Sequence, residues 1–146
     1  MSVEQRLERL ESREEIKELR AEYCYCVDDT DGEAFAALFT EDATLDFGSA
    51  GTYTGHEELR EFVDSVVPEH YEFIVHMVHN PVIDVDGDTA TGRWYFEAPC
   101  TSGGTDMWIQ GVYDEAYERV DGAWRFADVE ATFNYVAEYD EGWGEA

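Results

Sequence analysis

The fold is decided by the stretch DMWIQGVYDEAYERV (106–120), the turn Asp121-Gly122 and the stretch AWRFADVEATFNYVA (123–137). Both runs are rich in Val, Ile, Tyr, Trp and Phe, and an Asp-Gly pair between two such runs is typical of an antiparallel hairpin. Two earlier runs, 73–85 and 89–98, have the same character and are separated by Asp-Gly-Asp at 86–88. The sequence therefore predicts four strands in an antiparallel meander.

The part of the chain before residue 73 has mainly helical patterns. Apolar residues fall on or near one stripe of a helix that ends near Asp28, namely Leu7, Leu10, Ile16, Leu19, Tyr23 and Val27. Thr30 and Glu33 match a capping box that opens a short second helix. A brief strand is expected over 43–47, then a Gly-rich loop, then a third helix over 57–67 closed by Pro68.

Helices followed by an antiparallel sheet indicate one α+β domain spanning residues 1–146, with a strongly curved sheet wrapped around the N-terminal helices as a conical barrel. Such a sheet, closed on one side by helices, leaves a cone-shaped cavity. Aromatic residues at alternate strand positions, such as Trp94 and Phe96, are expected to line or fill it.

The amino-acid composition excludes some classes of protein and disfavours some classes of partner. The 146 residues are 44% hydrophobic and 14% aromatic, which is enough for a core and excludes a disordered acidic tail. Nine basic residues against 35 acidic ones give a formal net charge of −26, which disfavours nucleic-acid and anionic-membrane partners. The acids are dispersed and Lys17 is the only lysine, a pattern that resembles cytosolic proteins of salt-loving, halophilic microbes.

The start of the chain and the cysteines bear on localisation and redox state. Residues 1–20 carry charges throughout, and no stretch approaches the ~20 apolar residues of a membrane span, so we expect a cytoplasmic protein. Three cysteines, Cys24, Cys26 and Cys100, are an odd number and are interpreted as buried free thiols.

His76 is the first candidate for chemistry, because it lies in FIVHMV (73–78), where both strand faces are apolar and a buried imidazole needs a partner. Asp28 is the candidate partner, because the negative end of a helix dipole disfavours a carboxylate without compensation. Together they would form a general base and its orienting acid. A purely structural histidine is the alternative, and for Tyr23, on the same helix stripe, the alternative is a core residue.

The other histidines carry weaker signals. His79 forms a His-x-x-His pair with His76, but residues three apart on a strand face opposite sides, so no metal site is expected. His56 and His70 are interpreted as surface residues. P-loop, dinucleotide-binding and serine-hydrolase signatures do not occur in the sequence.

Three stretches together resemble the SnoaL-like branch of the nuclear transport factor 2-like superfamily: IKEL (16–19) leading to Tyr23 and CVD (26–28), HMVHNP (76–81) and TATGRWY (89–95). That branch includes scytalone dehydratase, hexachlorocyclohexane dehydrochlorinase and the bile-acid 7α-dehydratases. The resemblance implies a conical barrel of the cystatin-like type, often trimeric, with a cofactor-free Asp-His dyad. Asp28 and His76 match the dyad, and Tyr23 matches a tyrosine of the bile-acid enzymes.

The sequence also departs from that family. Gln110 stands where scytalone dehydratase has a second histidine, Phe47 stands where relatives have a tyrosine, with Tyr53 nearby, and Tyr23 replaces the lysine of the dehydrochlorinase. An arginine near the C-terminal strand of relatives is replaced by Val129 or Phe133. Substrate-binding residues are expected at Phe47, Tyr53, Trp94, Phe96, Trp108 and Gln110.

These observations predict a cofactor-independent, dehydratase-type lyase that removes water from a hydrophobic, carbonyl-containing small molecule, steroid-like or polyketide-like, through Asp28, His76 and Tyr23. An isomerase or cyclase would use the same base. A noncatalytic module for ligand binding or oligomerisation is the alternative from another class. A homo-oligomer, trimer or dimer, is expected.

Overall fold

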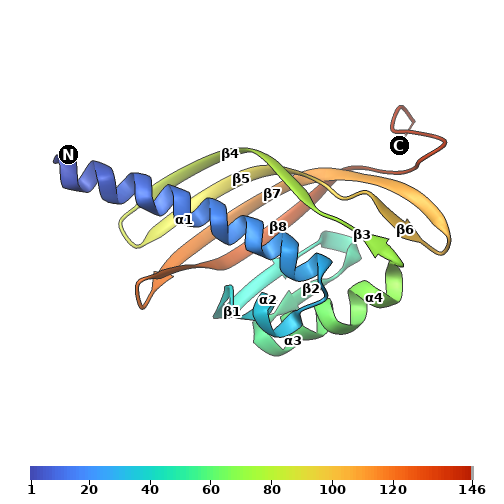
Figure 1. The fold of residues 1–146 in the computed structure, drawn as a ribbon, viewed down its shortest axis with the longest axis horizontal. Helices are drawn as coiled ribbons and strands as arrows, with labels where there is room; N and C mark the ends of the chain where they lie inside the picture. The colour runs from blue at the N-terminus through green and yellow to red at the C-terminus, as the bar shows by residue number, and fades with distance from the viewer. Residues whose placement is uncertain (146) are drawn as a thin grey trace.

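The computed structural model describes residues 1–145, and Figure 1 shows their course. Its helices are α1 (Val3–Asp28), α2 (Gly32–Ala36), α3 (Gly55–Glu61) and α4 (Val67–His70), with a 3-10 turn η1 (Gly48–Ala50) and a π-helical turn η2 (Phe62–Val66). Its strands are β1 (Phe39–Asp46), β2 (Thr52–Thr54), β3 (Phe73–Ile74), β4 (Met77–Asp86), β5 (Thr89–Glu97), β6 (Cys100–Ser102), β7 (Thr105–Val120) and β8 (Ala123–Glu138).

The strands form one curved sheet in the order β2-β1-β8-β7-β5-β4, with β6 pairing with β7 and β3 with β6. All pairs are antiparallel except β1 with β8. The expected α+β class and the curved, mainly antiparallel sheet are confirmed. The continuous strand expected over 73–85 is not: it breaks into β3 and β4, and residues 75–76 lie between them.

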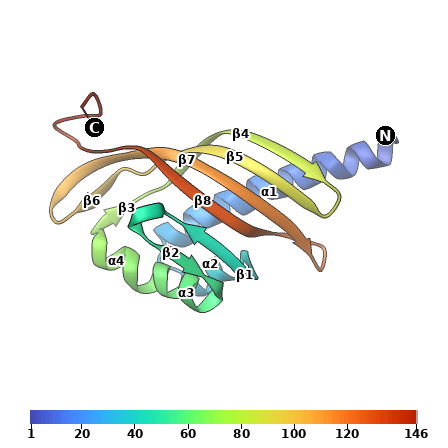
Figure 2. The ribbon, with the colours of Figure 1, turned by 180° about the vertical axis from the view of Figure 1, so that it is seen from behind.

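Helix α1 lies along one face of the sheet, as the two opposite views show (Figures 1 and 2). Ser2 and Gln5 form a capping box at its start. Its C-terminal half is buried through Ile16, Leu19 and Tyr23, whereas Leu7 and Leu10 are exposed, contrary to the predicted stripe. The first turns of α1 pack beside the polar rim of the sheet, where side chains such as Glu8 form ion pairs with strand residues.

The short helices gather at one end of the molecule beside β1 and β2 (Figure 2). Asp31, and not Thr30, caps α2: its side chain accepts from the Ala34 backbone N–H, while Thr30 has a positive φ of 57°. Pro68 does not close the third helix, because it occupies the first turn of α4, where its missing N–H costs nothing. The helical path therefore continues through η2 to His70. Within the described residues, no helix is both long and apolar enough to cross a membrane.

Candidate active site

Asp28 and His76 are joined by two hydrogen bonds. His76 Nδ1 lies 2.7 Å from Asp28 Oδ1, and the His76 backbone N–H donates to Asp28 Oδ2 at 3.1 Å. Asp28 ends α1, and His76 lies in the link between β3 and β4, so its backbone N–H is not used by the sheet. The side chains of His76 and Asp28 are only 11% and 17% exposed.

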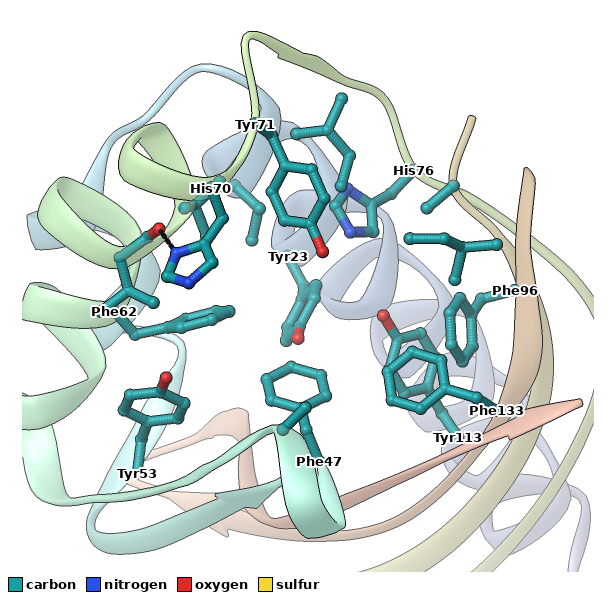
Figure 3. A pocket seen from close by; sticks show the side chains of 17 residues that line it. Tyr23, Phe47, Tyr53, Phe62, His70, Tyr71, His76, Phe96, Tyr113 and Phe133 are labelled. Carbon is teal, nitrogen blue, oxygen red and sulfur yellow. Dashed lines mark hydrogen bonds between the residues drawn. The ribbon is translucent and has the colours of Figure 1, made fainter. Parts of the chain in front are cut away.

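The partner of Nδ1 fixes the tautomer of His76. A carboxylate only accepts hydrogen bonds, so Nδ1 carries the proton and Nε2 of the neutral ring keeps a free lone pair. The ring lies in the wall of a cavity (Figure 3), so Nε2 is the basic atom available to a ligand. The arrangement is that of a general base held by a carboxylate.

The cavity beside His76 has a volume of about 370 Å³, within the usual range for small-molecule sites. Its lining is apolar apart from tyrosine hydroxyls and two imidazoles. The aromatic and histidine residues that line it, labelled in Figure 3, are Tyr23, Phe47, Tyr53, Phe62, His70, Tyr71, His76, Phe96, Tyr113 and Phe133. The described lining contains no Lys, Arg, Asp or Glu, so the cavity suits an uncharged ligand.

Five of the residues predicted for the site line this cavity: Tyr23, His76, Phe47, Tyr53 and Phe96. Tyr23 and His76 meet there, whereas Asp28, five positions after Tyr23 along α1, holds His76 without lining the cavity. The cavity spans the end of the helix, with Tyr23, Val27 and His76 in its wall.

Trp94, Trp108 and Gln110 were predicted to contact substrate, and the structure places all three outside the cavity lining. Trp94 is buried with Phe96 but lies two residues further from the cavity, where its Nε1–H donates to the Tyr117 hydroxyl at 3.0 Å.

Trp108 stacks on Tyr139 near the C-terminal segment, with ring centroids 5.6 Å apart. Gln110 lies at a register shift between β7 and β8, and its Oε1 accepts from Asn134 Nδ2 at 2.8 Å. Neither side chain is therefore available to a ligand in the cavity.

Three polar residues of the lining were not predicted: His70, Tyr71 and Tyr113. The sequence could have indicated Tyr113, because Ile109, Tyr113 and Tyr117 are four positions apart and therefore share one face of a strand over 106–120. No comparable pattern in the sequence marks His70 or Tyr71 as cavity residues. His70 was interpreted as a surface residue of a loop. It is exposed, as expected, but it ends α4, and its ring also borders the cavity (Figure 3).

A buried ion pair lies next to Tyr23 and Tyr113. Arg20 and Glu115 are 2.8 Å apart with fully buried side chains, and the Tyr117 hydroxyl donates to Glu115. The Arg20 guanidinium carbon lies 3.9 Å from the ring centroid of Tyr23 and 3.6 Å from that of Tyr113, so the cation packs against both rings.

Burial is the largest influence on the pKa values of Tyr23 and Tyr113. It raises the pKa of both Tyr23 and Tyr113 above the ordinary value, even though the neighbouring Arg20 acts in the opposite direction. Both hydroxyls therefore remain neutral at physiological pH. They can donate hydrogen bonds to a ligand oxygen.

The remaining candidates lie away from the cavity. His79 is exposed, and its Nε2 lies 3.3 Å from Glu97. Within residues 1–145, no three His, Cys, Asp or Glu side chains are placed to hold a metal ion. The three cysteines are free; Cys24 and Cys100 are buried as expected, but Cys26 is only half-buried.

Residues 8–130 match the model of the SnoaL-like domain. The chain belongs to the SnoaL-like domain family. This match confirms the resemblance stated from the sequence. The family assignment covers α1, with Asp28 at its end, and the sheet as far as the first half of β8.

Individual relatives agree with this SnoaL-like assignment. The chain is 26% identical over 132 residues to the gamma-hexachlorocyclohexane dehydrochlorinase of Sphingobium indicum, covering 88% of this chain and 85% of the relative. The crystal structure of hexachlorocyclohexane dehydrochlorinase LinA-type3 from Novosphingobium barchaimii has a TM-score of 0.84 at 28% identity, covering 90% of this chain and 92% of that one. An NTF2-like protein with a cystatin-like fold from Novosphingobium aromaticivorans has a TM-score of 0.79 at 26% identity, covering 90% and 88%.

Proposed function

We propose that the protein is a cofactor-independent lyase of the dehydratase type, which removes water from an uncharged, hydrophobic carbonyl compound. The observation that carries the proposal is the position of the Asp28–His76 pair in the wall of an apolar cavity. A histidine held by a carboxylate, in the wall of an apolar cavity, is suited to removing a proton from carbon.

In the proposed reaction, neutral His76 takes a proton from the carbon next to the carbonyl group. Asp28 orients the ring and stabilises the imidazolium that forms. Tyr23 donates a hydrogen bond to the carbonyl oxygen, where negative charge develops, and Tyr113 is placed to do the same. Loss of hydroxide from the next carbon then gives the unsaturated product.

Two further observations support this class of reaction. Relatives with 26–28% identity are named dehydrochlorinases, and loss of hydrogen chloride, like loss of water, is an elimination that removes a proton from carbon. The arginine expected from relatives is absent from this cavity, because Val129 is in the core and apolar Phe133 lines the wall. Neutral phenol donors therefore take the place of a cation, which favours a ketone over an anionic substrate.

The same base would serve an isomerase or cyclase, which needs no leaving group. A noncatalytic binding module is less well supported. It predicts a cavity filled by Trp94, Phe96 and Trp108. Phe96 lines the cavity but leaves it open, and the two tryptophan side chains lie elsewhere.

The proposal is tested on the aldol adduct of benzaldehyde and acetone, an uncharged aryl β-hydroxy ketone, by following formation of the conjugated product. His76→Ala should lower kcat by on the order of 10²-fold or more, with binding nearly unchanged, because the base acts only in the transition state. Asp28→Asn should be nearly as damaging. Tyr23→Phe should be milder, because it removes one hydrogen bond.

His79→Gln is the matched control, since it alters an exposed histidine outside the cavity. Wild-type turnover by the His76→Ala protein would contradict the mechanism. Binding without conversion by the wild type, across a panel of hydroxy ketones of increasing size, would favour the binding module.

A further inference from the structure

The structure assigns a second proton-transfer role in this cavity to His70. Resting on the proposed function, we propose that His70 in its protonated form donates the proton that turns the leaving hydroxyl group into water. His76 then acts only as the base. This divides acid and base between two histidines from different elements, α4 and the link between β3 and β4.

The hydrogen bonds of His70 fix which of its atoms can act. Its Nδ1 lies 2.8 Å from the carbonyl oxygen of Val66. A carbonyl oxygen only accepts, so Nδ1 is an N–H in both charge states, and Nε2 is the atom that gains and loses a proton. The dashed line in Figure 3 marks this bond, and the remainder of the ring borders the cavity.

The backbone around His70 is also held. Its carbonyl oxygen accepts from the Ser102 hydroxyl at 2.7 Å, which ties the end of α4 to β6. Pro68 restricts the backbone of the same short helix. The ring is thus positioned by its side chain and its main chain, as a proton donor requires.

The placement of the two imidazoles suits an elimination. The proton and the hydroxyl group leave from adjacent carbons, and in the anti arrangement they leave toward opposite sides. In Figure 3, His70 and His76 border the cavity from different sides, with the Tyr71 ring between them in that view. His70 is exposed, whereas His76 is mostly buried, so His70 can recover a proton from water between turnovers.

The proton balance is complete without a co-reactant. His76 Nε2 takes the proton from carbon, and the C–H electron pair forms the new C=C bond as the C–O bond breaks. The proton on His70 Nε2 moves to the departing oxygen, giving water. His76 then releases its proton to solvent and His70 takes one up, so the net products are the unsaturated ketone and water.

The test varies the leaving group. Chloride departs without protonation, so the aldol adduct of benzaldehyde and acetone is compared with the corresponding β-chloro ketone, after subtraction of the uncatalysed rates. His70→Gln cannot transfer a proton and should lower kcat for the hydroxy ketone by on the order of 10²-fold. It should leave kcat for the chloro ketone within about twofold, whereas His76→Ala should lower both. His79→Gln is the matched control, and thermal melts of each variant show that it is folded.

Two results would overturn the role of His70. The first is His70→Gln turnover of the hydroxy ketone equal to that of His79→Gln, and the second is an equal loss on both ketones, which would place His70 in binding or base chemistry. Failure of the wild type to convert either ketone is a different result. It would overturn the proposed function, and the assignment of His70 with it.

Discussion

At the scale of single residues, Asp28 carries a negative charge at the negative pole of α1, an unfavourable position without compensation. Two N–H groups of His76, one from the ring and one from the backbone, compensate for this by donating hydrogen bonds to the carboxylate. An asparagine has a single acceptor oxygen, so Asp28→Asn turns an NH2 group toward one of these donors. The variant therefore disturbs the ring or the link before β4, in addition to removing the charge.

The cysteines give a prediction at the same scale. Burial raises the pKa of Cys24 and of Cys100 to about 11, so both are protonated thiols near neutral pH, and only a thiolate attacks a disulfide reagent. Burial also raises the pKa of Cys26, but this thiol is only half-buried, so a reagent can reach it. A disulfide reagent at pH 8 should therefore find one reactive thiol in the native protein and two more only after unfolding. Cys26→Ser should abolish the early reaction, and rapid reaction of a second thiol in that variant would contradict the burial assignment.

Among the elements, α1 is joined to β7 by the ion pair of Arg20 with Glu115, whose side chains are fully buried. Arg20→Met alone leaves an unpaired carboxylate in the core, where burial already raises the pKa of Glu115 despite the opposing effect of Arg20. The free energy of unfolding should fall by about 3–5 kcal/mol, measured by denaturant titration.

The double variant Arg20→Met/Glu115→Leu removes both charges and keeps apolar volume. It should recover most of that loss, because replacing a complete buried pair is often neutral or stabilising. A double variant as unstable as the single one would mean that the pair is itself a net source of stability. Since Arg20 packs on Tyr23 and Tyr113, comparing kcat with stability in this variant also shows whether the cation helps to position those phenols.

The elements show where sequence patterns carry information and where they do not. Period-two runs and the Asp-Gly turns predicted the long strands, because alternation and turn chemistry are local. The parallel pairing of β1 with β8 was missed, since nothing local specifies a partner eighty residues away. The alternation of apolar and polar residues also predicts that Trp94 and Phe96 lie on one face of β5. It does not indicate which end of that face encloses the cavity.

The candidate site divides in the same way. Asp28 and His76 were found because each is anomalous in its own segment, a carboxylate at a helix end and an imidazole in an apolar run. His70 sits in a polar segment where a histidine is unremarkable. His70 reaches the cavity because α4 continues past Pro68, whereas the sequence pattern predicts that the helix ends at this proline.

For the whole molecule, self-association is expected from the exposed apolar side chains on the face of the sheet that α1 leaves uncovered. Met77, Val82 and Tyr95 are 41–71% exposed and lie on β4 and β5. Open curved sheets commonly cover such a face with another copy. Light scattering at micromolar concentration should give the mass of a trimer, or of a dimer. The mass of a monomer, 16.7 kDa, would contradict this expectation.

The formal net charge of −26 also belongs to the whole molecule. With 35 acidic residues against nine basic ones, most acidic groups have no basic partner. Most of the ion pairs in the described residues lie at the surface. Repulsion among these groups opposes the compact state, and salt shortens its range from about 10 Å at 0.1 M to about 3 Å at 1 M.

The melting temperature should therefore rise steeply between low and molar potassium chloride. Relief of roughly 3 kcal/mol corresponds to about 10 °C for a domain of this size. The control is the same titration nearer the sequence isoelectric point of about 4.1, where protonated carboxylates leave less repulsion to screen and the increase should shrink. A melting temperature that is flat in salt at neutral pH would show that the acidic surface does not limit stability. An equal increase at both pH values would indicate a general salt effect on apolar burial instead.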